Sequence, residues 1–96
     1  MLERDYQAKL IKRIKSEFYG SFVLKNDPNY IQGFPDLLIL HREKWAALEV
    51  KNSSQARHQP NQDYYVDHLD GIGYARFIFP ENEDSIINDL HRHFAD

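Results

Sequence analysis

The sequence has no cysteine, no long apolar segment and no signal-peptide pattern. Without cysteine, neither a disulfide framework nor a thiolate zinc site can form. A helix needs about 20 apolar residues to cross a bilayer, and no segment of this chain offers them. We therefore expect a soluble protein of the cytoplasm.

A surplus of basic residues is also missing. The 12 Lys and Arg residues are outnumbered by 15 Asp and Glu residues, which gives a net charge of −3 and a pI near 5.9. This balance counts against a strong non-specific binder of nucleic acid, because such proteins usually carry a basic surplus. It does not exclude a nuclease, since acidic metal ligands can coexist with a local basic patch and a bound Mg²⁺ reverses the sign of the site.

Length and composition predict one small globular domain that spans residues 1–96. Hydrophobic residues make up 42% of the chain and aromatic residues 14%, and no internal repeat or low-complexity linker interrupts it. A core of this size is small, so association with a second copy would help to stabilise it.

The hydrophobic pattern predicts a mixed α/β fold with elements in the order α-β-β-β-α-β-α. Apolar residues at helical spacing predict helices over residues 2–18, from Pro60 to about residue 70 with Gly71 as the stop, and over 82–94. The predicted strands are residues 21–26, 37–40, 45–50 and 74–79.

The candidate chemistry lies in a predicted hairpin. Side chains two residues apart in a strand share a face, so Glu49 and Lys51 point the same way, and strand pairing brings Asp36 towards Glu49. Two carboxylates suit Mg²⁺, and the carbonyl of Val50 can add a third oxygen ligand. A bound ion would activate a water molecule, which Lys51 could orient. Alternatively, Asp36 caps a turn, and Glu49 and Lys51 form the exposed face of an edge strand.

The first predicted helix carries a further carboxylate and several basic residues. Glu3 projects near the middle of the apolar stripe; it is either a first-turn acid favoured by the helix dipole or a third acid facing the metal cluster. Glu17 is the reserve candidate. Lys12 and Lys15 are candidate DNA contacts, although the basic residues can equally form a solvated face. These basic residues are Arg4, Lys9, Lys12, Arg13 and Lys15.

Residues 52–59 are polar and are predicted to form a loop. Because this loop begins just after Lys51, we expect it to overhang the site. Arg57 and His58 in this loop are either candidate phosphate contacts or ordinary solvated residues. Gln62 projects into the apolar face of the next helix. It is either a core glutamine bonded to the backbone, or its amide lies beside the scissile phosphate or the attacking water.

The order of these motifs resembles that of a known nuclease family. The Pro-Asp pair within residues 33–36 (Gly-Phe-Pro-Asp), followed by residues 49–51 (Glu-Val-Lys), resembles the PD-(D/E)xK nuclease signature. The subsequent Gln62, and Gly73 before an apolar strand, make the pattern similar to the VRR-NUC branch, in particular its short stand-alone phage and bacterial forms. The resemblance covers residues 3–79.

The resemblance implies a restriction-endonuclease-like core with a central mixed sheet flanked by helices. It implies a Mg²⁺-dependent endonuclease that hydrolyses phosphodiester bonds in DNA, with Mn²⁺ as a substitute ion. Asp36, Glu49 and Glu3 would hold the metal together with the Val50 carbonyl. Lys51 would position the attacking water, and the family's glutamine at the position of Gln62 implies an assisting role.

Stand-alone members of this family act on branched DNA, including four-way Holliday junctions. A junction is symmetric, so a homodimer that presents two sites would suit it. The resemblance places such a protein in the cytoplasm of a bacterial or phage-infected cell. Two other functions stay open: a restriction- or repair-type nuclease acting on linear or single-stranded DNA, and a non-catalytic DNA-binding module.

Overall fold

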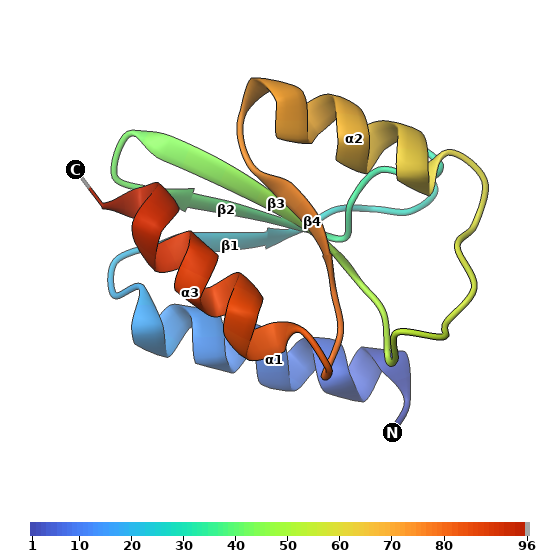
Figure 1. Ribbon diagram of the computed structural model, residues 1–96, viewed down its shortest axis with the longest axis horizontal. Helices are drawn as coiled ribbons and strands as arrows, with labels where there is room; N and C mark the ends of the chain where they lie inside the picture. The colour runs from blue at the N-terminus through green and yellow to red at the C-terminus, as the bar shows by residue number, and fades with distance from the viewer. Residues whose placement is uncertain (96) are drawn as a thin grey trace.

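The computed structural model describes residues 1–95, which form three layers: a four-stranded sheet with helices on both of its faces (Figure 1). The elements are α1 (Glu3–Glu17), β1 (Phe22–Lys25), β2 (Leu37–His41), β3 (Lys44–Val50), α2 (Gln62–Ile72), β4 (Ala75–Ile78) and α3 (Glu83–Phe94). This is the predicted order, and it confirms a mixed α/β fold in which helices flank a mixed sheet. None of the helices within residues 1–95 has the length and apolar character that crossing a membrane requires.

The sheet has the strand order β1-β2-β3-β4, with antiparallel pairing from β1 to β3 and a parallel pairing between β3 and β4. A parallel neighbour needs a crossover connection, which α2 supplies. The end of β3 is therefore held between two other strands. The interpretation in which Glu49 and Lys51 lie on an exposed edge strand is wrong, because β3 is an inner strand.

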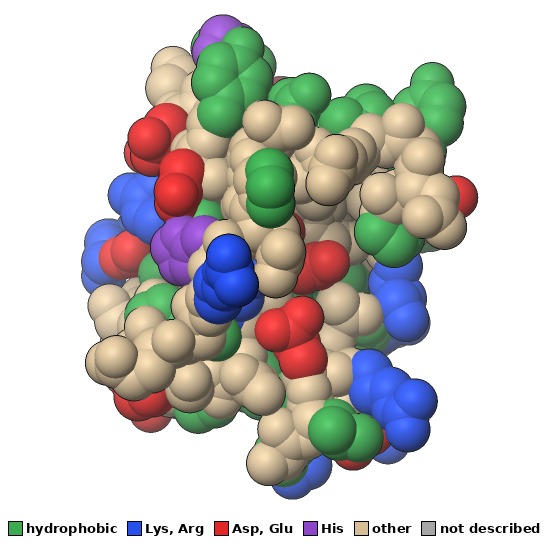
Figure 2. Space-filling model, turned by 90° about the vertical axis from the view of Figure 1, so that its right-hand side faces the viewer, with side chains coloured by type: hydrophobic (Ala, Val, Ile, Leu, Met, Phe, Trp, Pro, Cys, Tyr) green, Lys and Arg blue, Asp and Glu red, His purple; other side chains and the backbone are tan. Residues whose placement is uncertain are grey.

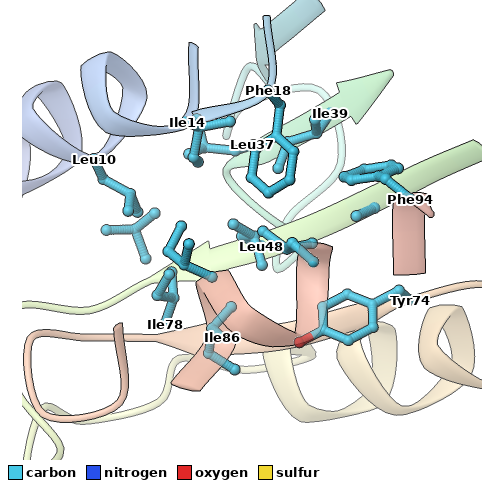
Figure 3. Packing of buried hydrophobic residues seen from close by; sticks show 14 of the residues in the cluster. Leu10, Ile14, Phe18, Leu37, Ile39, Leu48, Tyr74, Ile78, Ile86 and Phe94 are labelled. Atoms are coloured by element: carbon cyan, nitrogen blue, oxygen red, sulfur yellow. The ribbon is translucent and has the colours of Figure 1, made fainter. Parts of the chain in front are cut away.

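The larger core lies between the sheet and the helices α1 and α3 (Figure 3). Full burial of an aliphatic side chain contributes about 1.5–3 kcal/mol, so this layer fixes the sheet firmly against both helices. Its most deeply buried side chains are Leu10, Ile14, Leu37, Ile39, Leu48, Val50, Ile78, Ile87 and Leu90.

A smaller core lies on the opposite face, where Val66 of α2 packs on Ala47 and Ala75. Trp45 is half-buried beside it, and Gly73 packs against the indole ring. A Cβ atom at Gly73 would lie 2.3 Å from that ring, so only glycine fits there. The helix α2 covers β3 and β4 and leaves the same face of β1 and β2 without a helix (Figure 1).

The predicted boundaries of the second helix were wrong at both ends. The helix begins at Gln62 because Asn61 adopts a left-handed conformation with φ 71°, which leaves Pro60 outside the helix. Asparagine tolerates this region better than most residues. The helix also passes through Gly71 and ends at Ile72, so Gly71 is not its stop.

Candidate active site

The residues predicted for catalysis converge at one end of the sheet. Asp36 directly precedes β2, Glu49 and Lys51 stand at the end of β3, and Glu3 and Gln62 open α1 and α2. These segments meet at the end of the molecule that carries the N-terminus, on the right in Figure 1. Figure 2 looks onto this end and shows acidic side chains in the middle of the face, with a basic side chain and a histidine near them.

Asp36 takes the place of a missing partner in the β2–β3 ladder. The register of these strands ends at the pair Leu37 and Leu48, so its continuation would set Pro35 opposite Val50. Proline has no N–H, and it therefore offers no donor to the Val50 carbonyl. The Val50 N–H in turn donates a 2.9 Å hydrogen bond to Oδ2 of Asp36. This bond fixes the carboxylate beside a carbonyl that the ladder leaves without a donor.

Glu49 is only 2% exposed, although its side chain is a carboxyl group. Its Oε2 atom accepts a 3.0 Å hydrogen bond from Gln62 Nε2, whereas no donor reaches Oε1 in the part of the chain that the structure describes. Burial, and next the charge of the Asp36 carboxyl within hydrogen-bonding reach, raise the pKa of Glu49 to about 9, while the Lys51 ammonium opposes this shift. A buried carboxyl in such surroundings needs a proton or a cation.

Lys51 is also buried, at 5% exposure. Its Nζ atom donates a 3.0 Å hydrogen bond to the backbone carbonyl of Arg57. Its charge lowers the pKa values of both Glu49 and Glu3, so the ammonium lies among the carboxyl groups of the site. Because residue 57 belongs to the segment predicted to overhang the site, this contact confirms the position of that loop.

Glu3 reaches the site from the start of α1. Partial burial raises its pKa, Lys51 opposes this shift, Asp36 adds to it, and a hydrogen bond from the backbone of Asn52 lowers the pKa again. Glu3 lies on the same side of α1 as the buried Leu10 and Ile14, as predicted, but it keeps its contact with solvent. The buried face of this helix begins one turn later, at Tyr6. Glu3 therefore stands at the rim, facing Asp36 and Lys51.

Gln62 connects Glu49 to the overhanging loop. Its Oε1 atom accepts a 2.8 Å hydrogen bond from the Gln59 N–H, and its Nε2 atom donates to Glu49. Because the N–H donor occupies the amide oxygen, the NH₂ group must face the carboxylate. The hydrogen bond to the Gln59 backbone confirms that Gln62 is a backbone-bonded residue, although it is half-buried and not part of the core. The contact with Glu49 puts its amide next to the candidate site, while a position beside a phosphate or an attacking water stays a prediction.

The loop residues predicted to bind DNA differ in what they contact. The His58 ring stacks on Phe77 with the centroids 4.1 Å apart, and its Nδ1 atom lies 2.8 Å from Asp63. The Arg57 side chain is exposed, while its backbone carbonyl holds Lys51. His58 therefore anchors the loop, and Arg57 has the more available side chain for a phosphate.

The basic residues of α1 do not act as one group. Lys12 and Lys15 are exposed and lie about 14 and about 18 Å along the helix axis from Glu3, at 1.5 Å per residue. Arg13 is instead ion-paired to three acids, Glu17, Glu83 and Asp84. The reserve candidate Glu17 also contacts His91 and closes the opposite end of this helix, so it does not join the site.

The oxygen atoms that face the site suit a hard divalent cation. Glu49 contributes an unpartnered buried oxygen, Asp36 a second carboxylate, and Val50 a carbonyl for which Pro35 has no donor. Oxygen ligands of this kind are those that Mg²⁺ prefers, with water completing its shell. Within residues 1–95, no three His, Cys, Asp or Glu side chains are grouped to hold a metal ion. The two carboxylates and the Val50 carbonyl are therefore the oxygen atoms that suit a metal ion, and Glu3 lies outside this group.

Two contributors to the site were not predicted. They are the Arg57 carbonyl that holds Lys51 and the Gln59 N–H that fixes Gln62. Both are backbone groups of a loop, so no pattern of side chains could have identified them. The predicted position of the loop over the site was the available signal.

Comparison with known proteins supports the fold. A solved structure described as a VRR_NUC domain protein matches this chain with a TM-score of 0.74 and 16% sequence identity, covering 100% of this chain and 92% of the other. No family model matches the sequence, and no curated protein matches it either. At this level of identity the likeness concerns the fold, and the chain has the fold of a VRR_NUC domain protein.

Proposed function

We propose that this protein is a metal-dependent endonuclease that hydrolyses phosphodiester bonds in DNA, and that residues 1–96 form one nuclease domain of the PD-(D/E)xK superfamily. The observation that carries the proposal is the buried Glu49, with an unpartnered oxygen, next to Asp36 and Lys51 at the end of an inner strand. The fold shared with a VRR_NUC domain protein supports the same conclusion.

A purely structural role accounts poorly for this cluster. Burying a carboxylate oxygen to which no group donates destabilises the folded chain by about 1–3 kcal/mol. A second carboxyl at hydrogen-bonding distance makes ionisation of Glu49 less favourable still. An apolar side chain at position 49 would pack without either penalty, so we attribute the arrangement to chemistry.

Mg²⁺, or Mn²⁺ in its place, would be held by Asp36, Glu49 and the Val50 carbonyl, with Glu3 at the rim. When bound, the ion supplies an activated water molecule and stabilises charge on the phosphate. Lys51, held by the Arg57 carbonyl, orients that water or stabilises the negative charge that develops on a phosphate oxygen.

Gln62 would assist by holding the Glu49 carboxylate through its Nε2 atom. Water attacks phosphorus in line with the leaving oxygen, the P–O ester bond breaks, and the leaving oxygen takes up a proton. The products are a phosphate monoester and a hydroxyl group.

The proposed substrate is branched DNA such as a Holliday junction, cut by a homodimer that presents two sites. Among the candidate DNA contacts, the exposed Arg57 is next to the site. Lys12 and Lys15 would contact the phosphates of an arm that lies along α1. His58 would contribute by holding the loop in place.

The proposal is tested by incubating a labelled four-way junction, a linear duplex and a single strand of matched sequence with the protein in Mg²⁺, Mn²⁺ or EDTA. The inactive control is Asp36→Asn, which keeps an acceptor for the Val50 N–H and removes the charge. We expect metal-dependent cutting of the junction that this substitution abolishes.

Equal cutting of linear or single-stranded DNA would instead indicate a restriction- or repair-type nuclease. DNA binding by folded protein without any cleavage would indicate a non-catalytic module and contradict the proposal.

A further inference from the structure

One face of the sheet is apolar and largely uncovered. On β1, Phe22 and Leu24 pair with Leu40 and Leu38 of β2, and Trp45 of β3 pairs with Leu40, so all five side chains lie on the same face. Since α2 packs over β3 and β4, Phe22 stays 68% exposed, Leu24 45% and Leu40 39%. We call these five residues the open sheet face.

An apolar groove continues from this face towards the candidate active site. Leu38, Leu40 and Trp45 line a pocket of about 300 Å³, and Tyr30 and Phe34 line one of about 340 Å³. Phe34 lines both pockets, so they are neighbours on either side of this residue, and we call the two together the groove. Neither pocket is lined by a lysine or an arginine. A protein surface that binds nucleic acid is polar and strongly positive, so this groove is unsuited to DNA.

Further exposed hydrophobic side chains border the groove. The Tyr64 ring contacts Tyr65, whose ring in turn contacts Phe34, and Ile72 lies two turns after Tyr65 on the same side of α2. Tyr64 is 63% exposed and Ile72 is 67% exposed. Figure 2 shows exposed hydrophobic side chains along the upper margin of the end that carries the site.

The exposed apolar area matches the need of a protein interface. The exposed fractions of Phe22, Tyr30 and Tyr64 amount to about two whole aromatic side chains, which is roughly 300–500 Å² at 150–250 Å² each. The neighbouring aliphatic side chains add to this area. A standard interface buries about 800 Å² on each partner, of which about 65% is apolar in homodimers.

We propose that a second copy of this chain covers the open sheet face and its groove, and that this face is the interface of the homodimer. This inference rests on the proposed function in one respect: cutting a symmetric junction gives a reason for a dimer with two active sites. An identical apolar face is complementary to itself around a two-fold axis. β1 is also an edge strand, whose outer side a second copy would protect.

This interface would hold the two active sites in a fixed relation. Phe34, in the groove wall, stands two residues before Asp36. Gly33 packs closely on Pro60 and Asn61, just before α2, since a Cβ atom there would lie 2.7 Å from the Pro60 carbonyl oxygen. A partner that presses on this wall therefore contacts the segment that carries Asp36.

The test is the mass of the protein in solution as a function of concentration, measured by sedimentation or light scattering. Wild-type protein should dimerise with a dissociation constant in the micromolar range or tighter. Phe22→Glu should raise this constant at least about 100-fold, because symmetry buries the new charge twice. Tyr30→Glu, in an exposed loop, should act in the same direction without loss of fold. The matched control Tyr19→Glu, at a 93% exposed aromatic outside this face, should leave the dimer unchanged.

A wild-type protein that stays monomeric would overturn the proposal, as would dimers that survive both substitutions or that Tyr19→Glu disrupts equally. A monomer whose affinity for DNA falls with Phe22→Glu would assign the face to nucleic acid instead. The Asp36→Asn protein should still dimerise while it loses cleavage. Failure of the nuclease proposal is therefore distinguishable from failure of this one.

Discussion

The amide of Gln62 donates a 3.0 Å hydrogen bond to Glu49 and accepts a 2.8 Å hydrogen bond from the backbone of Gln59. The start of α2 therefore controls the orientation of a buried carboxylate on β3. Gln62 differs from the other polar residues of the loop and of α2 because its side chain contacts Glu49 directly.

Replacing Gln62 with alanine should lower the rate of DNA cleavage about 10- to 100-fold. The substitution removes a hydrogen bond to a charged group, which contributes about 1.5–3 kcal/mol. Gln59→Ala is the matched control, since it keeps the backbone N–H and should leave the rate unchanged. Single-turnover cleavage measures both variants, and equal rates for Gln62→Ala and wild type would remove Gln62 from the site.

The raised pKa of Glu49, about 9, predicts how stability depends on pH in metal-free protein. Between the ordinary glutamate pKa of 4.5 and about 9, the folded chain holds a proton that the unfolded chain has released, so stability falls as pH rises. Glu49→Gln removes this dependence. We expect the variant to be about 1–3 kcal/mol more stable than wild type at pH 8, with little difference at pH 5.

Urea denaturation in EDTA at several pH values measures this difference. Added Mg²⁺ should stabilise the wild type much more than Glu49→Gln, because the variant has lost one of the two carboxylates that would hold the ion. A constant difference between the two proteins from pH 5 to pH 8 would contradict the shifted pKa of Glu49.

Two glycines near the end of α2 should respond oppositely to alanine. Gly73→Ala places a Cβ atom 2.3 Å from the Trp45 ring and should destabilise the fold by about 1–3 kcal/mol. Gly71→Ala meets no atom within 4 Å inside the helix and should stabilise it by about 0.5–1 kcal/mol. Thermal denaturation compares the two, and equal Tm shifts would show that contact with Trp45 is not the cause.

The hairpin was the most predictable part of the molecule. Alternation along β3 puts Glu49 and Lys51 on one face, and pairing with β2 brings Asp36 near, so a local pattern was enough to predict the convergence. Whether β3 was an edge or an inner strand depends on β4, which pairs with it only after α2 has crossed over. No local pattern carries that information.

Tertiary contacts account for the other differences. The start of α2 shifted to Gln62 because Asn61, packed against Gly33, adopts a left-handed conformation. Arg13 looked like a basic surface residue, yet acids of α3, distant in sequence, bind its guanidinium. In both cases the partner lies far along the chain, beyond the reach of periodicity and capping rules.

Lys51 and Arg57 share one hydrogen bond but should have separable roles. Lys51→Met should lower the cleavage rate about 100- to 10,000-fold with little change in DNA affinity, because it removes the ammonium and keeps much of the buried stem.

Arg57→Ala keeps the backbone carbonyl that holds Lys51 and removes the exposed guanidinium. It should therefore weaken DNA binding, reduce the slope of log affinity against log salt by about 1, and leave the rate on saturating DNA near that of wild type. Fluorescence anisotropy and single-turnover cleavage separate the two effects. A lower saturating rate for Arg57→Ala would mean that its side chain, and not its carbonyl alone, takes part in the reaction.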